Sequence, residues 1–249
     1  MMILDSLIDG IYKKAAVRKI EDVRIGLGYT AVLLDNGSCG LAYTFRNELG
    51  YCCCILKEAG QIKGLKCGDV IQWVKDANLA RTAVGLATIN ALIQEDVKDY
   101  KCGNIFNNLQ LTPENILGVI GDFGPFLKNI RKQVKDMYVF EKKVHKIQGY
   151  MYPAELTDKY LPKCDVVIIT STSILNKTFE DIIKKCKNAR EIILIGPSTP
   201  LYPELFKKYN VTYLAGVVVC KAEQVLDIVS QGGGTRSLGN SVKQACIKI

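Results

Sequence analysis

From residue 116 onward the chain alternates short apolar runs with amphipathic segments, and this alternation limits the possible folds more than any other feature. The apolar runs are strand-sized and lie at 116–122, 165–173, 191–199 and 211–219. Stretches with helical spacing of apolar residues separate them. Such alternation predicts a parallel sheet whose two faces are both covered by helices. We therefore expect an α/β domain over residues 111–249.

The N-terminal part has a different pattern, with strands first and helices afterwards. An amphipathic helix is expected over 5–19, capped by Asp5 or Ser6, and two strands over 23–34 and 39–45 around an Asn-Gly turn. The stretch 51–56 is a third strand candidate. Helical patterns cover 69–77 and the residues after Asn78, which is the expected N-cap. Residues 1–110 are therefore predicted to form a smaller α+β domain, and the irregular segment 98–115 places the boundary near residue 110.

Composition indicates an ordinary globular protein. Hydrophobic residues make up 48% and charged residues 23% of the 249 residues. The apolar runs are far shorter than the ~20 residues that span a bilayer, and the N-terminus has no secretory leader, so no membrane segment and a cytoplasmic location are expected. Ten cysteines in this compartment are expected to be reduced thiols. The net charge of +8 is spread over helix-like stretches without interleaved aromatic residues, so a nucleic-acid partner is not expected. The sequence does not determine the oligomeric state, and a homo-oligomer is one of the possibilities.

Polar, small and conformationally special residues follow the predicted strands of the α/β domain. In a parallel sheet, ligands bind beyond the carboxyl ends of the strands. We therefore expect a ligand site in a cleft roofed by the N-terminal domain, with these residues around it: Asn78, Gly121, Asp122, Phe123, Gly124, Glu141, Thr170, Ser171, Thr172, Gly196, Pro197, Ser198 and Thr199. Asp122 and Glu141 are the candidate ligands of a divalent metal ion or acid/base groups, and the hydroxyls would orient a small molecule.

The turn after the first strand leaves a nucleotide cofactor as an alternative. Glu141 lies 20 positions after Gly121, where an acid that binds a ribose would stand. The glycines, however, fall at 118, 121 and 124 rather than in the order GxGxxG, and Asp122 would repel a pyrophosphate. An NAD or S-adenosylmethionine site and a plain tight turn both remain open.

Cys52, Cys53 and Cys54 stand side by side, yet they do not predict a metal site. In a strand, Cys52 and Cys54 share one face while Cys53 points to the other, so three thiolates cannot converge on one ion. No CxxC pair occurs, and His145 is the only histidine. The triplet is interpreted as structural, with a soft metal held by Cys52 and Cys54 as the alternative.

Four segments carry a resemblance to a known family: "RTAVGLATINALI", "VIGDFGP", "DVVIITSTSILNKTFEDII" and "ILIGPSTPLYPELFKKY". They resemble the prokaryotic family labelled putative heavy-metal chelation over nearly the whole chain. The resemblance implies an N-terminal domain similar to that of enolase, a Rossmann-like C-terminal domain and a site between them. The matching positions are Asn78, Asn90, Gly121, Phe123, Thr170, Lys177, Thr178, Gly196, Pro197, Thr199, Pro200 and Gly216.

This chain departs from the family pattern in two places. The cysteine triplet is not part of the pattern, and Asp122 stands where a relative carries histidine. Taken together, the sequence predicts a two-domain protein that binds a small polar ligand, a metal ion or metal chelate included, in the cleft. The alternative is an enzyme that uses an adenosine-containing cofactor such as S-adenosylmethionine or NAD.

Overall fold

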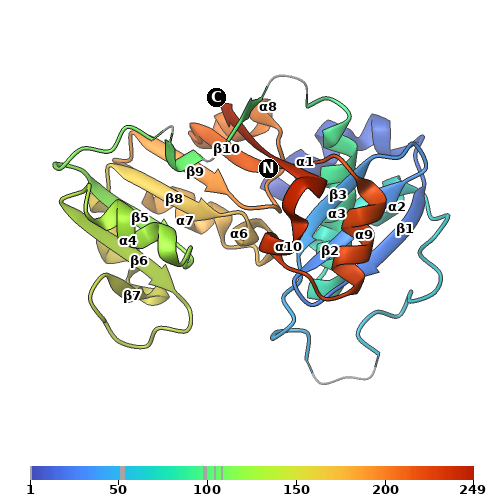
Figure 1. Cartoon of the computed structure of the whole chain (residues 1–249), viewed down its shortest axis with the longest axis horizontal. Helices are drawn as coiled ribbons and strands as arrows, with labels where there is room; N and C mark the ends of the chain where they lie inside the picture. Colours follow the sequence, from blue (N-terminus) through green and yellow to red (C-terminus); the bar gives the residue numbers. More distant parts are fainter. Residues whose placement is uncertain (1, 51–53, 98–99, 104, 108) are drawn as a thin grey trace.

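The computed structural model describes residues 2–50, 54–97, 100–103, 105–107 and 109–249. Figure 1 shows two lobes that lie side by side, with the blue N-terminal strands in one and the green, yellow and orange strands in the other. Within the described part of the chain, none of the helices combines the length and the apolar character needed to cross a bilayer.

The smaller, N-terminal lobe is built on an antiparallel sheet in the order β1-β2-β3. The strands are β1 (Ile20–Ile25), β2 (Tyr29–Leu34) and β3 (Cys39–Tyr43). The helical segments that precede or follow them are α1 (Ile3–Ala15), α2 (Cys67–Val70), the 3₁₀ helix η1 (Ile71–Lys75) and α3 (Leu79–Gln94).

The larger lobe is built on a sheet whose described strands have the order β4-β11-β10-β9-β8-β5-β6-β7. Neighbouring strands are parallel from β10 to β7, while β11 pairs antiparallel with both β10 and β4. The strands are β4 (Lys101–Cys102), β5 (Ile116–Ile120), β6 (Asp136–Glu141), β7 (Met151–Pro153), β8 (Val166–Thr170), β9 (Glu191–Ile195), β10 (Tyr213–Val219) and β11 (Val242–Lys248). This arrangement confirms the predicted α/β class with a smaller α+β part.

The helices of the larger lobe cover both faces of its sheet. On one face Leu127 of α4 packs with Val119, and on the other Phe179 of α7 packs with Ile169. The α-helices after residue 110 are α4 (Pro125–Arg131), α5 (Thr157–Tyr160), α6 (Thr172–Leu175), α7 (Phe179–Lys185), α8 (Pro203–Phe206), α9 (Ala222–Ser230) and α10 (Thr235–Leu238). Of these, α9 and α10 pack against the N-terminal sheet instead. The 3₁₀ helices are η2 (Ile105–Asn107), η3 (Ala154–Leu156), η4 (Leu161–Lys163), η5 (Lys207–Tyr209) and η6 (Gly239–Ser241).

The strand order reverses between β5 and β8. The chain runs from β5 outward through β6 and β7 and then returns to β8 on the other side of β5. The connections that leave β5 and β8 therefore diverge, which opens a crevice at the carboxyl ends of these strands. This crevice faces the loop after β3.

The two lobes pack against each other, because α9 from the C-terminal part of the chain covers one face of the N-terminal sheet (Figure 1). All six residues of β2 are buried. Ala31 and Leu33 pack with Val225 and Val229 of α9 in one cluster, while Val32 belongs to the cluster that contains α3. The division near residue 110 stays a prediction, and α9 crosses it in space.

Several predicted bounds were wrong for local reasons. The expected strand 23–34 is two strands, and Gly26 between them lets Val229 of α9 approach, since a Cβ there would stand 2.1 Å from its carbonyl oxygen. The amphipathic stretch 125–137 is expected to be helical throughout, but its helix ends at Arg131, whose guanidinium donates to the carbonyl oxygen of Val134 and so stabilises the turn into β6.

The remaining differences are at element ends. Helix α1 has Met2 as its N-cap without a side-chain cap, rather than Asp5 or Ser6. The expected third strand at 51–56 cannot be followed through 51–53, which lie outside the described residues, and 54–56 are not in a strand. The expected Asn-Gly turn is confirmed, with Gly37 at φ +85° between β2 and β3.

Gly40 marks the closest approach between β3 and α3. A Cβ on Gly40 would stand 2.2 Å from the carbonyl oxygen of Ala87 and 2.3 Å from the amide nitrogen of Ala91. We expect Gly40→Ala to lower the free energy of unfolding by about 1–3 kcal/mol, because two backbones must move apart. Urea denaturation measures this, with Gly234→Ala as the control, since a Cβ there meets nothing within 4 Å. Equal midpoints for the two variants would show that the contact is not restrictive.

Candidate functional site

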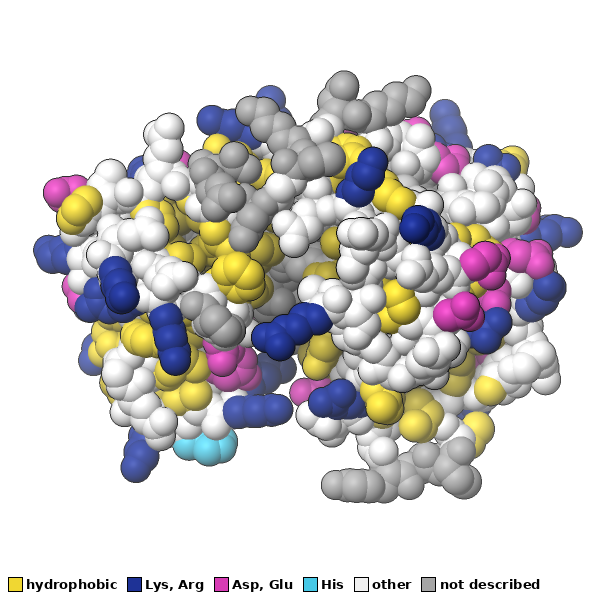
Figure 2. All heavy atoms as spheres, in the orientation of Figure 1, with side chains coloured by type: hydrophobic (Ala, Val, Ile, Leu, Met, Phe, Trp, Pro, Cys, Tyr) yellow, Lys and Arg dark blue, Asp and Glu magenta, His cyan; other side chains and the backbone are white. Residues whose placement is uncertain are grey.

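A cleft of about 800 Å³ opens at the carboxyl ends of β5, β6 and β8. Its roof comes from Tyr43 at the end of β3 and from the loop that follows, with Phe45, Asn47 and Glu48. On the face in Figure 2, Lys and Arg side chains gather with acidic ones where the two lobes meet. The volume is in the range of sites for small organic molecules. The cleft is therefore where the strand topology predicts a ligand.

The floor of the cleft is the turn after β5. Gly121 has φ +95°, and a Cβ there would lie 3.2 Å from Cγ2 of Thr170. The Oδ1 atom of Asp122 accepts a hydrogen bond from the amide of Gly124 at 2.8 Å. Gly124, at φ +61°, is the N-cap of α4. The side chain of Asp122 thus closes its own turn with one oxygen, and no described residue pairs with its other oxygen.

Glu141 is the last residue of β6 and lines the cleft. It is half-buried, and no described residue forms a hydrogen bond or an ion pair with its carboxylate. Lys142 and Lys143 follow it on the same rim and are exposed. On the opposite wall, Lys185 of α7 donates a hydrogen bond to Oγ1 of Thr157 at 3.0 Å. The cleft lining therefore holds charges of both signs.

A wall of small polar side chains follows β8. The hydroxyls of Thr170 and Thr172 lie 3.0 Å apart and form a hydrogen bond. Oδ1 of Asn176 accepts from the amide of Thr178 at 3.2 Å and from its hydroxyl at 2.6 Å. The hydroxyl of Ser173 is buried without a partner. An unpaired buried hydroxyl is costly, so a ligand that pairs with it would gain affinity.

The apolar part of the lining includes four aromatic rings. Phe123 and Phe140 stand beside the floor, and Tyr43 and Phe45 in the roof form an edge-to-face pair at 5.1 Å. Aromatic faces next to charged groups favour an organic ligand with a planar or apolar part.

Six of the thirteen predicted site residues line this cleft, and the others lie elsewhere. Those in the cleft are Gly121, Asp122, Phe123, Glu141, Thr170 and Thr172. Those outside its lining are Asn78, Gly124, Ser171, Gly196, Pro197, Ser198 and Thr199.

Ser198 and Thr199 have partners within the protein and join the lobes. The Oγ atom of Ser198 accepts a hydrogen bond from the amide of Tyr43 at 2.8 Å, and its carbonyl oxygen accepts one from Nδ2 of Asn90 at 3.2 Å. The hydroxyl of Thr199 donates to the carbonyl oxygen of Ala215 at 3.0 Å. Both side chains are buried. They position the roof of the cleft rather than line it.

Asn78, Ser171 and Gly196 also have local structural environments. Oδ1 of Asn78 accepts from the amides at the start of α3, at 2.9 and 3.2 Å, which confirms the predicted N-cap. Gly196 has φ +136°, and a Cβ there would lie 2.6 Å from Oγ of Ser171. Glycine at 196 thus makes room for the buried Ser171 side chain.

The sequence interpretation missed several residues that line the cleft. Lys142 and Lys143 directly follow Glu141, the last residue of β6, and Asp181 and Lys185 lie four residues apart on α7. These positions at the end of a strand and on one face of a helix could have been recognised in the sequence as candidates for the cleft. No sequence pattern marks Asn47 and Glu48 as candidates for the cleft. The full set of missed polar residues is Asn47, Glu48, Lys142, Lys143, Thr157, Ser173, Asn176, Thr178, Asp181 and Lys185.

The described residues do not form a site for a soft metal ion. No group of three or more His, Cys, Asp or Glu side chains among them could hold a metal. Burial raises the pKa of the thiols of Cys39, Cys67, Cys164 and Cys186 to about 12, so these cysteines are neutral at pH 7 and poor metal ligands. Cys52 and Cys53 lie outside the described residues. The cleft offers the carboxylates of Asp122 and Glu141, which are hard oxygen donors.

Comparisons with known proteins identify relatives over almost all of the chain. A family model described as "Putative heavy-metal chelation" matches residues 104–248, and a second model with the same description matches residues 5–93. An uncharacterized protein of Methanocaldococcus jannaschii is 26% identical over 218 residues, which cover 84% of this chain and 82% of that protein.

Two crystal structures of proteins with unknown function from the DUF364 family share the fold. The one from Pyrococcus horikoshii has a TM-score of 0.86 at 25% identity and covers 100% of both chains. The one from Desulfitobacterium hafniense has a TM-score of 0.82 at 24% identity and covers 99% of this chain and 97% of its own.

Ser198 and Ser171 form a matched pair for testing which predicted site residues are structural. Both are 1% exposed, but only Ser198 has a partner for its hydroxyl. We expect Ser198→Ala to lower the free energy of unfolding by about 1–3 kcal/mol, because the amide of Tyr43 loses its acceptor. Ser171→Ala should be neutral or stabilising. Thermal and urea unfolding of both variants measure this, and a larger loss for Ser171→Ala would overturn the assignment.

Proposed function

This chain belongs to the family described as "Putative heavy-metal chelation", and from that premise we propose that it binds a small polar organic molecule, alone or as a metal chelate, in the cleft at the ends of β5, β6 and β8. The observation that carries the proposal is the half-buried carboxylate of Glu141, which has no described protein partner and lines a cleft of about 800 Å³. A charged group in such a place is left for a ligand, because burying it unpaired has a cost.

The lining favours an organic molecule over a bare ion. A bare cation needs several converging donors at about 2–2.5 Å, whereas the cleft is many times larger and offers only dispersed carboxylates. The rings of Phe123 and Phe140 supply apolar contact on one side, and the lysines at 142 and 143 supply positive charge on the rim. A ligand with an apolar or planar body and both acidic and basic substituents would match these groups.

A metal ion fits this cleft only together with a chelating molecule. Soft metals prefer thiolate or imidazole ligands, and among the described residues no cysteine or histidine lines the cleft. A hard divalent ion could be bound by Asp122 and Glu141 if the organic ligand completed its coordination. The family description is therefore compatible with this chain in the form of a metal chelate rather than of a heavy-metal ion bound by protein side chains alone.

A second candidate function is an enzyme with an adenosine-containing cofactor. The strand order around β5 is that of a doubly wound sheet, and Glu141 ends the second strand, the usual place of an acid that hydrogen-bonds to a ribose. The carboxylate of Asp122 stands in the turn after β5, where it would repel a pyrophosphate, and this favours a nucleoside or S-adenosylmethionine over a dinucleotide.

The finer descriptions from the sequence remain part of this proposal. We propose the Rossmann-like label for the larger lobe from its strand order, and the enolase-like label for the N-terminal lobe from the resemblance alone. Among the described residues, Cys39, Cys67, Cys164, Cys186 and Cys220 are free thiols, which suit a reducing compartment and support a proposed cytoplasmic location.

The two carboxylates test the site directly. We expect Asp122→Asn combined with Glu141→Gln to weaken binding of the cognate molecule about 10- to 100-fold, because hydrogen bonds to charged groups are lost. Calorimetric titration of Zn²⁺, Cd²⁺ and Mg²⁺, each alone and with citrate as chelator, and of a metabolite panel would measure the change. Glu155→Gln, an exposed acid outside the cleft lining, is the control. Unchanged binding in the double variant would discard the site.

A thermal-shift screen separates the two functions. If the ligand contains adenosine, S-adenosylmethionine, NAD or ATP at about 100 times its Kd should add about 2.7 kcal/mol to the free energy of unfolding. The shift should become smaller in Glu141→Gln, because a neutral amide with one acceptor oxygen replaces the carboxylate that accepts from the ribose hydroxyls through two. No shift with any of the three would remove the cofactor hypothesis and leave the proposed chelate site untouched.

A further inference from the structure

Lys177 has an unusual backbone conformation beside the cleft. Its φ is +62°, a left-handed value that among the described non-glycine residues recurs only at Asn210. Its neighbours Asn176 and Thr178 both line the cleft and are hydrogen-bonded to each other. A lysine with this backbone needs contacts that compensate for the strain.

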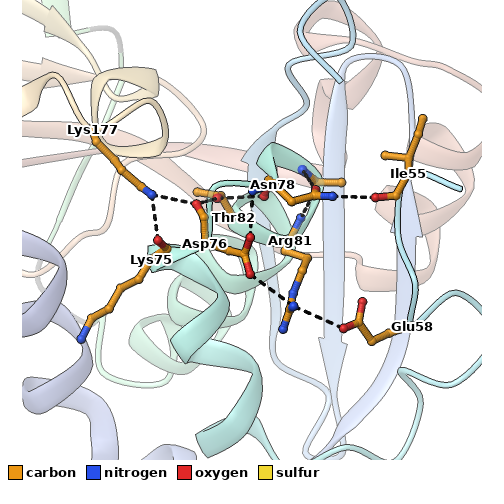
Figure 3. A network of polar contacts seen from close by, with 9 residues as sticks. Ile55, Glu58, Lys75, Asp76, Asn78, Arg81, Thr82 and Lys177 are labelled. Atoms are coloured by element: carbon orange, nitrogen blue, oxygen red, sulfur yellow. Dashed lines mark hydrogen bonds and ion pairs between the residues drawn. The ribbon is translucent and has the colours of Figure 1, made fainter. Parts of the chain in front are cut away.

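The side chain of Lys177 supplies such contacts by crossing to the other lobe. Its ammonium donates hydrogen bonds to the carbonyl oxygens of Lys75 at 2.8 Å and Asp76 at 2.7 Å, as Figure 3 shows. These carbonyls stand at the C-terminal end of η1, where a cation is favourable. The turn at 176–178 is thereby fastened to the N-terminal lobe.

From Asp76 the polar contacts continue into α3. Oδ1 of Asp76 accepts from the amide of Asn78 at 2.8 Å, and Oδ2 pairs with the guanidinium of Arg81 at 3.2 Å. The hydroxyl of Thr82 donates to the same carbonyl oxygen that Lys177 contacts, at 3.1 Å. The backbone and the side chain of Asp76 are both held, so a shift of Asp76 would disturb the start of α3 (Figure 3).

A third segment joins the network at 55–58. Nδ2 of Asn78 donates to the carbonyl oxygen of Ile55 at 2.7 Å, and Arg81 pairs with Glu58 at 3.4 Å. This segment belongs to the long connection after β3 whose first residues, Phe45 and Asn47 among them, form the roof of the cleft. One set of contacts thus runs from the wall after β8 to the connection that carries the roof.

We propose that Lys177 is a positioning residue that fixes the wall of the cleft at 176–178 relative to its roof, so that the polar groups of both face the ligand at a set separation. The proposal rests on the proposed function only in taking the cleft as the binding site. Lys177 is exposed and lies outside the cleft lining, so it acts through Asn176 and Thr178 rather than by touching the ligand.

Hydrogen–deuterium exchange of the full chain without ligand tests the tether. The variant Lys177→Asn accepts the left-handed backbone but loses the ammonium, whereas Lys177→Arg keeps the cation. Lys184→Met, at an exposed lysine of α7 that pairs with Asp181 at 3.5 Å, is the matched control. We expect Lys177→Asn to raise the rate of amide exchange about five- to tenfold in peptides that cover 172–178, 76–82 and 54–62. A factor of this size corresponds to the loss of the exposed hydrogen bonds that one ammonium group donates.

Two results distinguish a positioning role of Lys177 from general stabilisation: rescue by Lys177→Arg, and the segments in which exchange increases. Exchange in Lys177→Arg should stay within about twofold of the wild type in all three segments, since a cation still reaches the carbonyls. An increase confined to 172–178, an even increase over the whole chain, or the same pattern in Lys184→Met would overturn the proposal. If Lys177→Asn does not fold, Lys177→Gln replaces it with the same expectation.

The exchange experiment needs no ligand, so its outcome can be compared with that of the binding titrations. Exchange that follows the expected pattern while no panel molecule binds would retain the tether and reject the proposed function. Ligand binding with unchanged exchange at 54–62 would retain the function and reject the tether.

Discussion

The outer edge of β3 is the constraint on which the rest of the structure depends. An edge strand presents backbone groups that need partners, and here side chains rather than another strand supply them. Ser198 accepts the amide hydrogen of Tyr43, and Asn90 donates to the carbonyl oxygen of Leu41 at 2.8 Å and to that of Ser198. Because Ser198 follows β9, these bonds hold the large sheet against the small one. The roof of the cleft begins at Tyr43, so its position follows from this edge.

A second consequence is that the two lobes cannot be treated as independent units. Gln94 at the end of α3 exchanges two hydrogen bonds with the backbone of Val219 in β10, at 3.1 and 2.8 Å, much as a neighbouring strand would. Helix α9 buries Val225 and Leu226 against the N-terminal sheet. Opening the cleft by a rigid movement of the lobes would break these contacts. The segment 176–178 adds a further link, because the ammonium of Lys177 donates to the carbonyl oxygens of Lys75 and Asp76 in the other lobe.

The sequence predicts the elements of this fold better than the positions of its side chains. Alternation of apolar and amphipathic runs predicted β5, β8, β9 and β10, and the residue type of Asn78 predicted a cap, because both signals are local. Ser198 was assigned to the ligand site because strand ends usually carry ligands, whereas its partner Tyr43 lies 155 residues earlier. Lys177 matched a family position without a visible role, since its partners are 101 and 102 residues away. Side-chain partners of this kind are not encoded in any window of the sequence.

The distribution of donor atoms decides how the family description applies to this chain. The buried thiols of Cys39, Cys67, Cys164 and Cys186 are distributed through apolar clusters, where desolvation keeps them protonated. The cleft instead contains carboxylates, hydroxyls and lysines around aromatic rings. Lysines repel a bare cation but attract the negative charge that a chelating molecule brings with it. A cleft with both signs of charge therefore supports the proposal of a metal chelate as ligand. Its organic part would contact the rim and the rings, and Asp122 and Glu141 would contact positive or hydrogen-bonding groups of the ligand at the floor.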